Sequence, residues 1–432
     1  MSNLEELIER LCPDGVEYKP LWSVTAWDKK FNAVDRSMQP KTYSYHVLLA
    51  KDLFAMKQET GDVFLLSTGV ETGWTTEEIA GDFMCEGEVV TIPWGKSSPV
   101  KGLIKYYNGK FVTGDNRIAT SLNTDVLDNK YLYYWMVNNG EAIDKFYRGS
   151  GIKHPSMYDV LTMKLPVPPL EVQREIVRIL DNFTFLTTEL AAELAARQKQ
   201  YEYYRDLLLT FKPNESTILN ERTNELELSG AIRWMKLGDL SITITKGTTP
   251  KTYSKSGICF IRTEAIESDL INFDKVKYID DDVHNGSLRR SILQANDILF
   301  TIAGATIGKC VVVPASALPA NTNQALAIIR LKENYEHKYI FYLLKSKYMK
   351  DYIQKSIKGS AQPNLNLQQL NDFVIPVPPL EVQQRIVDIL DRFDTLCNDI
   401  SSGLPAEIEA RQKQYEYYRD KLLSFKELKK EA

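Results

Sequence analysis

Two distant segments of this sequence carry the same eight residues, Pro166 to Gln173 and Pro376 to Gln383. Each copy opens a helical pattern of about forty residues, and both patterns close with the same eleven residues, Ala196 to Asp206 and Ala410 to Asp420. A long stretch that differs from its counterpart precedes each copy. The sequence therefore predicts a tandem duplication in which two similar joints carry two divergent modules.

Apolar and aromatic residues recur at steps of three and four from Val172 to Phe211, and again from Val382 to Phe425. This spacing is that of a coiled-coil seam. At 1.5 Å per residue each helix would be about 60 Å long, which favours a pair of spacer helices over two ordinary core helices.

The offset between the two copies rises from 210 residues, between Pro166 and Pro376, to 214 residues, between Arg197 and Arg411. Because the four added residues make one helical step, both seams stay in phase and are predicted to pack on each other. Within the insertion, Pro405 removes a backbone donor and crowds the preceding turn. The second helix is therefore predicted to be kinked or broken between Ser401 and Pro405.

The two divergent stretches share a pattern of short apolar runs broken by Gly, Pro, Asn and Asp, and Gly87 to Ile92 aligns with Asn296 to Thr301. The predicted fold class is α+β: two similar α/β modules separated by two long antiparallel helices that form a coiled coil, with an internal pseudo-twofold repeat. The predicted parts are a first module (1–165), a long helix (166–212), a linker (213–230), a second module (231–375), a second long helix (376–426) and a tail (427–432).

The composition excludes several classes of protein. Five scattered cysteines and four histidines form no Cys-x-x-Cys or His-x-x-x-His pair, so neither disulfides nor a zinc site is expected. The first residues lack a signal-peptide pattern and no apolar run is long enough to span a membrane, which predicts a cytoplasmic protein. The net charge of -4 would confine any nucleic-acid binding to local basic patches.

Several strings imitate catalytic motifs without completing them. Gly304 to Cys310 is one residue short of a phosphate loop and ends in Cys where a Mg²⁺-binding Ser or Thr belongs. Val167 to Leu170 echoes the Pro-Pro loop of adenine methyltransferases but lacks its Asp or Asn and its aromatic residue. The sequence therefore predicts no catalytic residues, no metal and no cofactor in this chain.

Loops in matching places of both modules carry side chains of the kinds that contact phosphates and base edges. Asn323-Gln324 of the second module is aligned with Asn116-Arg117 of the first. For each residue taken singly, the alternative is a solvated surface position. The candidates are Lys96, Ser97, Lys101, Asn116 and Arg117 in the first module, and Lys246, Thr248, Thr249, Lys251, Tyr253, Arg262, Asn323 and Gln324 in the second.

With the duplicated motifs, the opening Leu11 to Tyr18 and the turn Lys246 to Pro250, the chain resembles the specificity subunit of type I restriction-modification systems. The resemblance covers essentially the whole chain. It implies that 1–165 and 231–375 are target recognition domains, each reading half of a split DNA site. It also implies that 166–212 and 376–426 are the central and C-terminal conserved regions.

The resemblance further implies partners: double-stranded DNA, two adenine methyltransferase subunits and two ATP-dependent restriction subunits. S-adenosylmethionine, ATP and Mg²⁺ would belong to these partners, and the chain itself would be non-catalytic. The helix ends are candidate docking surfaces for the methyltransferases, or alternatively the core of the helix pair. The residues concerned are Tyr201, Tyr204, Arg205, Tyr415, Tyr418 and Arg419.

The segment Thr188 to Ala195 holds two similar tetrapeptides in tandem and resembles a repeat whose copy number sets the gap between half-sites. Four helical residues add about 6 Å and about 400° of rotation, a little over one turn. The apolar seam would therefore still face the other helix as the gap between the half-sites grows. Two other classes stay open: a coiled-coil scaffold that presents two protein-binding modules without DNA, and a single-chain enzyme with an unrecognised site.

Overall fold

The computed structural model describes residues 2–69, 72–96, 98–114, 116–211, 218–220, 225–227, 232–267, 269–357, 364–399 and 402–428. The chain forms two compact units, residues 1–189 with 409–432 and residues 190–408. The predicted linker 213–230 lies outside the described residues, apart from the paired strands β12 (Ile218–Asn220) and β13 (Glu225–Glu227).

The first unit is built on a seven-stranded mixed sheet. Its order is β2 (Thr25–Trp27), β8 (Asn116–Ser121), β6 (Cys85–Pro93), β7 (Lys105–Gly114), β4 (Val63–Leu66) and β5 (Gly73–Thr75), with β3 (Val47–Leu48) also beside β7. Helix α5 (Asn129–Asn138) packs on β6 and β7. The other elements are α1 (Ser2–Leu11), β1 (Tyr18–Pro20), α2 (Leu21–Val24), α3 (Ala50–Ala55), α4 (Glu77–Ala80), α6 (Gly140–Asp144), β9 (Tyr147–Arg148), β10 (His154–Pro155), α7 (Met157–Thr162) and β11 (Lys164–Pro166).

The second unit repeats this plan with smaller sheets. A four-stranded sheet has the order β15 (Ser241–Lys246), β23 (Leu326–Leu331), β20 (Ile298–Thr301) and β21 (Cys310–Val312), which matches β2, β8, β6 and β7. A three-stranded sheet follows, in the order β19 (Lys277–Ile279), β16 (Ile258–Ile261) and β22 (Ala320–Thr322). The other elements are β14 (Arg233–Lys236), α9 (Leu237–Leu240), β17 (Ile266–Glu267), β18 (Leu270–Ile271), α10 (Asp281–Asn285), α11 (His337–Lys345), α12 (Lys347–Ser356), α13 (Leu367–Asn371) and β24 (Val374–Val377).

The repeated Pro-Val-Pro-Pro-Leu-Glu-Val-Gln motif makes the same joint in both units. It ends strand β11 or β24 and starts helix α8 (Leu170–Leu208) or α14 (Leu380–Asn398). The side chain of Gln173 is buried, donates to the carbonyl of Pro168 (2.7 Å) and accepts from the backbone N–H just before α5 (2.9 Å). Gln383 does the same with Pro378 (2.8 Å) and with the N–H before α11 (3.3 Å). The glutamine therefore ties each module to its long helix.

A carboxylate farther along each long helix reinforces the joint. Asp181 of α8 accepts a hydrogen bond from Tyr134 (2.6 Å) and pairs with Lys130 (2.8 Å), both on α5. Asp391 of α14 makes the same two contacts with the matching tyrosine and lysine of α11. The internal repeat is thus preserved in side-chain contacts as well as in sequence.

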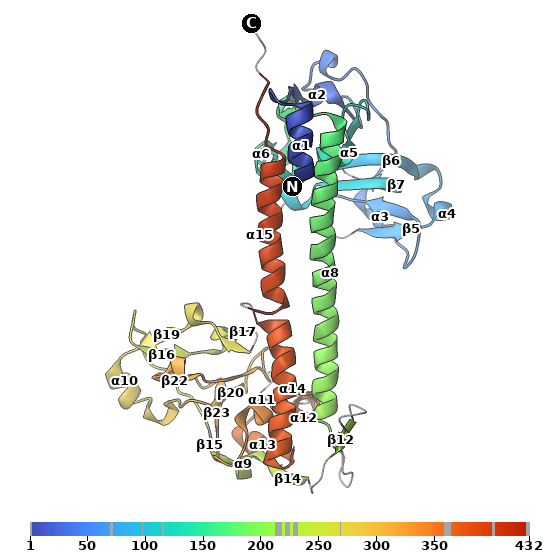
Figure 1. Cartoon of the computed structure of the whole chain (residues 1–432). Coiled ribbons are helices and arrows are strands. Elements are labelled where there is room, and N and C mark those ends of the chain that lie inside the picture. The colour runs from blue at the N-terminus through green and yellow to red at the C-terminus, as the bar shows by residue number, and fades with distance from the viewer. Residues whose placement is uncertain are drawn as a thin grey trace. The chain divides into compact units, whose positions relative to one another are not determined.

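The end of one long helix packs beside the start of the other within each unit. In the first unit α8 runs antiparallel to α15 (Leu404–Leu422), and Phe183 stacks on Tyr418 with ring centroids 5.5 Å apart. In the second unit the last part of α8 runs beside α14, and Phe393 stacks on Tyr204 at 5.6 Å. The antiparallel helix pair predicted from the heptad seam is confirmed within each unit (Figure 1).

The predicted break in the second long helix is also confirmed. Helix α14 ends at Asn398 and α15 begins at Leu404. Gly403 lies between them, and a Cβ there would fall 2.5 Å from the carbonyl oxygen of Thr395. Because no side chain fits this close approach, the turn requires glycine next to the Leu404-Pro405 helix start.

Candidate nucleic-acid interface

The predicted DNA-contacting residues of the second module gather at one edge of its sheets. Lys246 ends β15, and the turn that follows is bonded to the last residue of β22 and to the loop after it. The N–H of Thr248 donates to the carbonyl of Thr322 (3.0 Å), and the hydroxyl of Thr249 donates to the side-chain oxygen of Gln324 (2.6 Å). The side chains of Lys246, Thr248, Thr249 and Gln324 are exposed, so this edge presents a polar, basic surface.

Arg262 and Asn323 reach the same edge from two neighbouring strands. Strands β16 and β22 are parallel, so their carboxyl ends meet, and Arg262 and Asn323 are the residues just beyond those ends. The guanidinium of Arg262 lies 6.0 Å from the ring centroid of Tyr253, which is 42% exposed, and Nε lies 3.7 Å from the carboxylate of Glu264. The Nε of Arg262 and the Oδ1 of Asn323 are buried and find no hydrogen-bond partner among the described residues. Lys251 is exposed in the adjoining loop.

The predicted residues of the first module have different surroundings. Lys96 is buried, forms an ion pair with Asp144 and lies 5.1 Å from the ring of Tyr147. Lys101 is half-buried, and its side chain packs against Gly140. Ser97 lies outside the described residues. The loop lysines are therefore engaged by the module itself.

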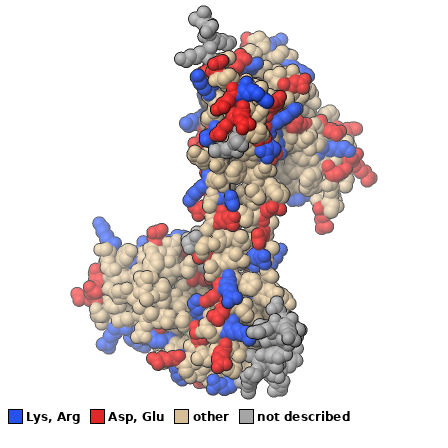
Figure 2. All heavy atoms as spheres, in the orientation of Figure 1, with Lys and Arg blue, Asp and Glu red and all other residues tan. Residues whose placement is uncertain are grey.

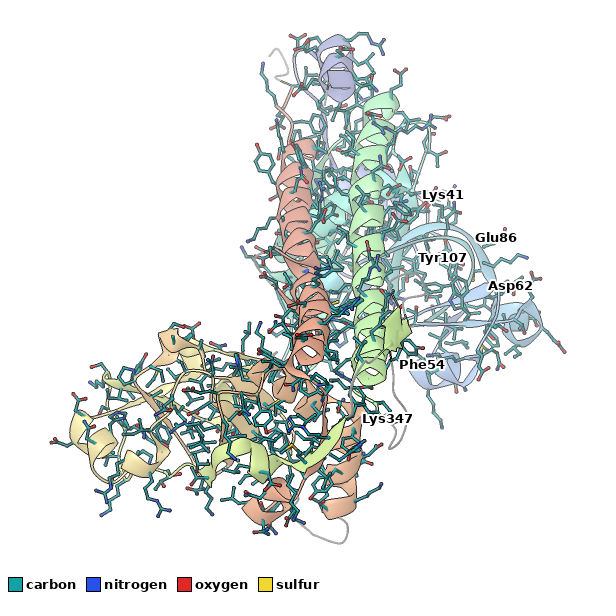
Figure 3. All side chains as sticks on the ribbon, turned by 60° about the horizontal axis from the view of Figure 1, so that its bottom comes forward. Lys41, Phe54, Asp62, Glu86, Tyr107 and Lys347 are labelled. Atoms are coloured by element: carbon teal, nitrogen blue, oxygen red, sulfur yellow. The ribbon has the colours of Figure 1, made fainter. Side chains whose placement is uncertain are left out.

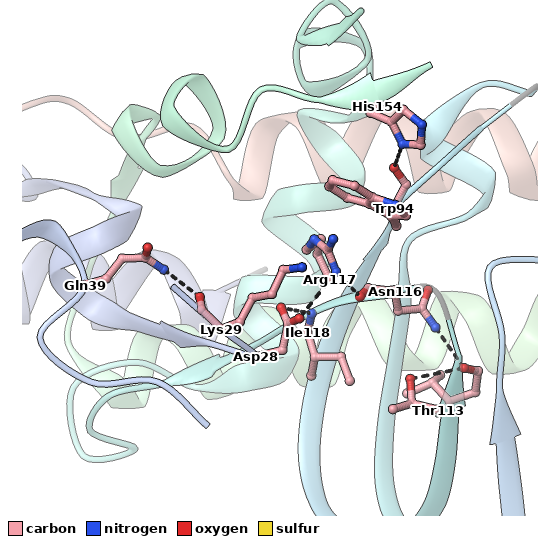
Figure 4. A network of polar contacts seen from close by, with 10 residues as sticks. Asp28, Lys29, Gln39, Trp94, Thr113, Asn116, Arg117, Ile118 and His154 are labelled. Carbon is pink, nitrogen blue, oxygen red and sulfur yellow. Dashed lines mark hydrogen bonds and ion pairs between the residues drawn. The ribbon is translucent and has the colours of Figure 1, made fainter. Parts of the chain in front are cut away.

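Asn116 and Arg117 lie inside the module, in the polar network drawn in Figure 4. Asn116 donates to the carbonyl of Leu66 (2.8 Å). The guanidinium of Arg117 lies 3.7 Å from the ring centroid of Trp94 and 3.4 Å from the carboxylate of Asp28. Burial raises the pKa of Asp28, and the charge of Arg117 and a backbone N–H partly offset that rise. These contacts hold the start of β8 in place and leave neither side chain at the surface.

The sheet registers explain why the two modules differ here. Arg117 lies opposite Ile92, and Leu326 lies opposite Thr301. Ile92 and Thr301 occupy equivalent positions on β6 and β20, so Arg117 corresponds to Leu326. The alignment of Asn116-Arg117 with Asn323-Gln324 was therefore wrong by two residues, because matching the shared Asn ignored the strand pairing.

The basic loop that corresponds to the Lys246 turn was not predicted from the sequence. Strand β2 follows α2 just as β15 follows α9, and Lys29, Lys30 and Lys41 are exposed in the loop after β2. The ammonium of Lys29 lies 5.4 Å from the ring of Trp94, and that of Lys41, labelled in Figure 3, lies 4.7 Å from the ring of Tyr43. The sequence does contain a pattern that predicts this loop. Both α2 and α9 begin with a leucine and are followed at a similar distance by lysine.

The six predicted partner-interface residues belong to the helix pairs. Tyr201, Arg205 and Arg419 are buried, while Tyr204, Tyr415 and Tyr418 are half-buried and lie within 6.5 Å of Phe393 or Phe183. Two neighbouring tyrosines point outward instead: Tyr203 is 63% exposed and Tyr417 is 64% exposed.

Charges of both signs are interspersed on the face shown in Figure 2. Among the described residues, no group of three or more His, Cys, Asp or Glu side chains could hold a metal ion. No described helix is long and apolar enough to cross a membrane.

Comparison with known proteins gives one consistent result. The family model for the type I restriction modification DNA specificity domain matches residues 53–197 and 233–410. The Escherichia coli type I restriction enzyme EcoR124I/EcoR124II specificity subunit is 31% identical, with 98% of this chain and 97% of that protein covered. A putative type I specificity subunit of Haemophilus influenzae is 30% identical over 98% of this chain and 100% of that protein. The crystal structure of a type I S subunit from M. genitalium has a similar fold, with a TM-score of 0.56, 15% identity, and 95% and 96% of the two chains covered.

We expect Arg117→Met to destabilise the first unit by about 3–5 kcal/mol, because it leaves the buried carboxylate of Asp28 without its partner. Since burial already raises the pKa of Asp28, the variant should lose less stability at acidic than at neutral pH, where the carboxyl must ionise inside the unit. Urea unfolding at both pH values measures this loss. Asp28→Asn combined with Arg117→Met is the control, and a loss of the same size in the double variant would contradict the ion-pair explanation.

Proposed function

Because this chain belongs to the family of type I restriction-modification specificity subunits, which are non-catalytic, we propose that it reads a bipartite DNA site with one module on each half. The two modules share a framework, and their edge loops differ in side chains. Similar frameworks with different loops suit the reading of two unlike half-sites. In this proposal S-adenosylmethionine, ATP and Mg²⁺ act in the partner subunits, and this chain holds none of them.

The observation that carries the proposal is the convergence of Arg262 and Asn323 in the second module. Arginine is suited to bidentate contact with guanine and asparagine to contact with adenine. Each has a buried polar atom without a hydrogen-bond partner among the described residues, and such groups cost free energy unless a ligand satisfies them. The exposed Lys246 and Lys251 beside them would neutralise phosphates and position the module.

In the first module we assign phosphate contact to Lys29, Lys30 and Lys41. They take the place of the Lys246 turn after the equivalent strand, and all three are exposed. Arg117 would act indirectly, since its ion pair with Asp28 holds the residue next to Lys29. Lys96 and Asn116 bond to Asp144 and Leu66 inside the module and would support its structure. This division makes both modules use the same loop after the same strand.

The helix pairs are proposed to dock the methyltransferase subunits through Tyr203 and Tyr417. The two tyrosines occupy equivalent places in the repeat, and each packs edge-on against the next tyrosine at an interplanar angle of 74°. Exposed aromatic side chains on rigid helices are common anchors of protein interfaces. Two equivalent anchors on one chain fit two copies of one partner.

Helix α8 is proposed to set the gap between the half-sites. It is continuous from Leu170 to Leu208 and contains both tetrapeptides of the segment Thr188 to Ala195. Each tetrapeptide contributes about 6 Å of helix, which is close to two base pairs of DNA.

We expect Arg262→Ala and Asn323→Ala each to weaken recognition of one half-site by about 1–3 kcal/mol and to leave the other half-site unchanged. The subunit is assayed with its methyltransferase partner, by DNA shift and by sequencing of methylated sites. Arg289→Ala, which alters an exposed arginine elsewhere in the same module, is the matched control.

Exchange of residues 16–165 with those of a related chain tests the same proposal from the other module. One half-site should change. A change in both half-sites, or in neither, would contradict the assignment of one module to one half. A chain that retains no DNA even with its methyltransferase present would be a scaffold.

We expect Tyr203→Ala and Tyr417→Ala each to remove one methyltransferase copy, since loss of an interface aromatic anchor costs about 2 kcal/mol or more. Native mass spectrometry of the co-purified complex should show one copy with either single variant and none with the double variant. Tyr158→Ala is the control, because Tyr158 is 49% exposed on α7 of the first module. A double variant that keeps both copies would refute this docking surface.

Deletion of Ala192 to Ala195 should shorten the preferred gap by about two base pairs and leave both half-sites intact. The reason is that four residues make about one helical turn, so the apolar seam of α8 still faces the other long helix. Sequencing of the methylated sites measures the gap, and an unchanged gap would refute the spacer role of α8.

A further inference from the structure

A cavity of about 430 Å³ opens in the second unit between the end of α8, the loop before β21 and the helices α11 and α12. Its volume is within the usual range for small-ligand sites. An apolar wall is formed by Leu344, Ile353 and Ile357. The cationic residues that line it are Arg205, Lys309, Lys345 and Lys350.

The charge inside this cavity is not balanced. Its one lining carboxylate, Asp269, forms an ion pair with Lys345, and Arg205 pairs with the adjacent Asp206 (3.0 Å), which does not line the cavity. Lys309 and Lys350 are exposed toward solvent and form no ion pair with a described residue. The cavity therefore presents an excess of positive charge beside an apolar wall.

Comparison of the two joints shows what is special about Arg205. In the first unit the matching arginine, Arg419, donates from Nε to the side-chain oxygen of Asn138 (2.8 Å). The position of Asn138 is taken in the second unit by Ser346, whose hydroxyl donates to its own helix instead. The hydrogen bonds of Arg205 to described residues go only to the adjacent Asp206 (3.1 Å). Since a guanidinium has five N–H donors, Arg205 keeps donors for a ligand in the cavity.

Two nearby residues have unusual features. Asp269 has a φ of 66° because it stands in the tight turn between the paired strands β17 and β18, where Glu267 lies opposite Leu270. Tyr201, whose ring centroid is 6.0 Å from the ammonium of Lys345, has a buried hydroxyl with no hydrogen-bond partner among the described residues. The turn accounts for the backbone of Asp269, and Tyr201 does not itself line the cavity, so the ligand site is indicated by its volume, its charge and Arg205.

We propose that this cavity binds a phosphate ester that carries an apolar or aromatic body of about the size of a mononucleotide. Arg205 and the lysines would bind the phosphate through charge-assisted hydrogen bonds, and the wall around Leu344 would cover the body. Lys309 belongs to the string that imitates a phosphate loop, but β21 follows it where a phosphate loop has a helix. The anion is therefore held by side chains, and its binding does not require that the chain reads a bipartite DNA site.

The cavity extends to helix α12, which begins at Lys347, labelled in Figure 3, with its N–H donating to Asp206 (3.1 Å). Lys350 and Lys355 both lie on this helix and both are exposed, but only Lys350 lines the cavity. Lys355→Ala is therefore a control on the same element for the loss of Lys350. Thermal unfolding should be the same for all these variants, since the altered side chains are exposed.

The test is isothermal titration calorimetry of the full chain with adenosine monophosphate. We expect saturable binding that Lys309→Ala combined with Lys350→Ala weakens about tenfold or more, through the loss of two charge-assisted hydrogen bonds, and that Lys355→Ala leaves unchanged. Absence of saturable binding, or equal binding by the double variant, overturns the proposal. Inorganic phosphate that binds as tightly as the nucleotide overturns the part assigned to the apolar wall.

A short DNA duplex without the bipartite site, added as competitor, identifies the source of the phosphate. In one outcome the duplex displaces the nucleotide, and the double variant binds both the nucleotide and the duplex more weakly. This result supports the phosphate site and assigns it to the DNA backbone. Binding of the nucleotide without displacement supports the site and assigns it to a free nucleotide. Recognition of the bipartite site is measured separately by DNA shift, so its failure is distinguishable from failure of the cavity proposal.

Discussion

The stacking of a phenylalanine from one repeat on a tyrosine from the other is the interaction on which both units depend. Phe183 meets Tyr418 in the first unit, and Phe393 meets Tyr204 in the second. One such pair is worth only about 0.5–1.5 kcal/mol beyond its buried area, but it aligns the start of one long helix with the end of the other. The first unit is therefore incomplete until the last residues of the chain return, and its contacts have very long sequence separation. Such topology slows folding, which places completion of the first unit after synthesis of the whole chain.

The long helices could be predicted because their pattern is local. The heptad steps follow from residues three and four apart, and Pro405 marks the break between α14 and α15 without any knowledge of the fold. The sheets could not be predicted in the same way. Strands β3 and β4 both pair with β7 in parallel. Pairing between segments that lie far apart in the chain produces no repeating pattern of apolar residues from which it could be predicted.

The candidate site shows the same limit at the level of single residues. In the second module Lys246, Thr249 and Arg262 meet at one edge, as expected of loops in matching places. In the first module Arg117 is a residue of the type that often contacts DNA, but it is bonded to a carboxylate inside the module. That carboxylate belongs to Asp28, which lies 89 residues away in the chain. Nothing local distinguishes an exposed arginine from one held inside by a distant aspartate. The exposed lysines after β2 were missed although each short helix is followed at a similar distance by lysine, a local pattern that the sequence does contain.

The duplication supplies an internal comparison that a single module would lack. Both joints keep the glutamine of the motif, the aspartate on the long helix and the tyrosine-phenylalanine stack, so these contacts define what a joint requires. Against this shared background, the replacement of Asn138 by Ser346 stands out, because it releases one arginine from its amide partner. An asparagine at position 346 would stand where Asn138 stands beside Arg419, and would offer Arg205 the amide oxygen that it lacks. Arg205 therefore lacks the amide partner that Arg419 has, which is why the anion site is proposed for the second unit.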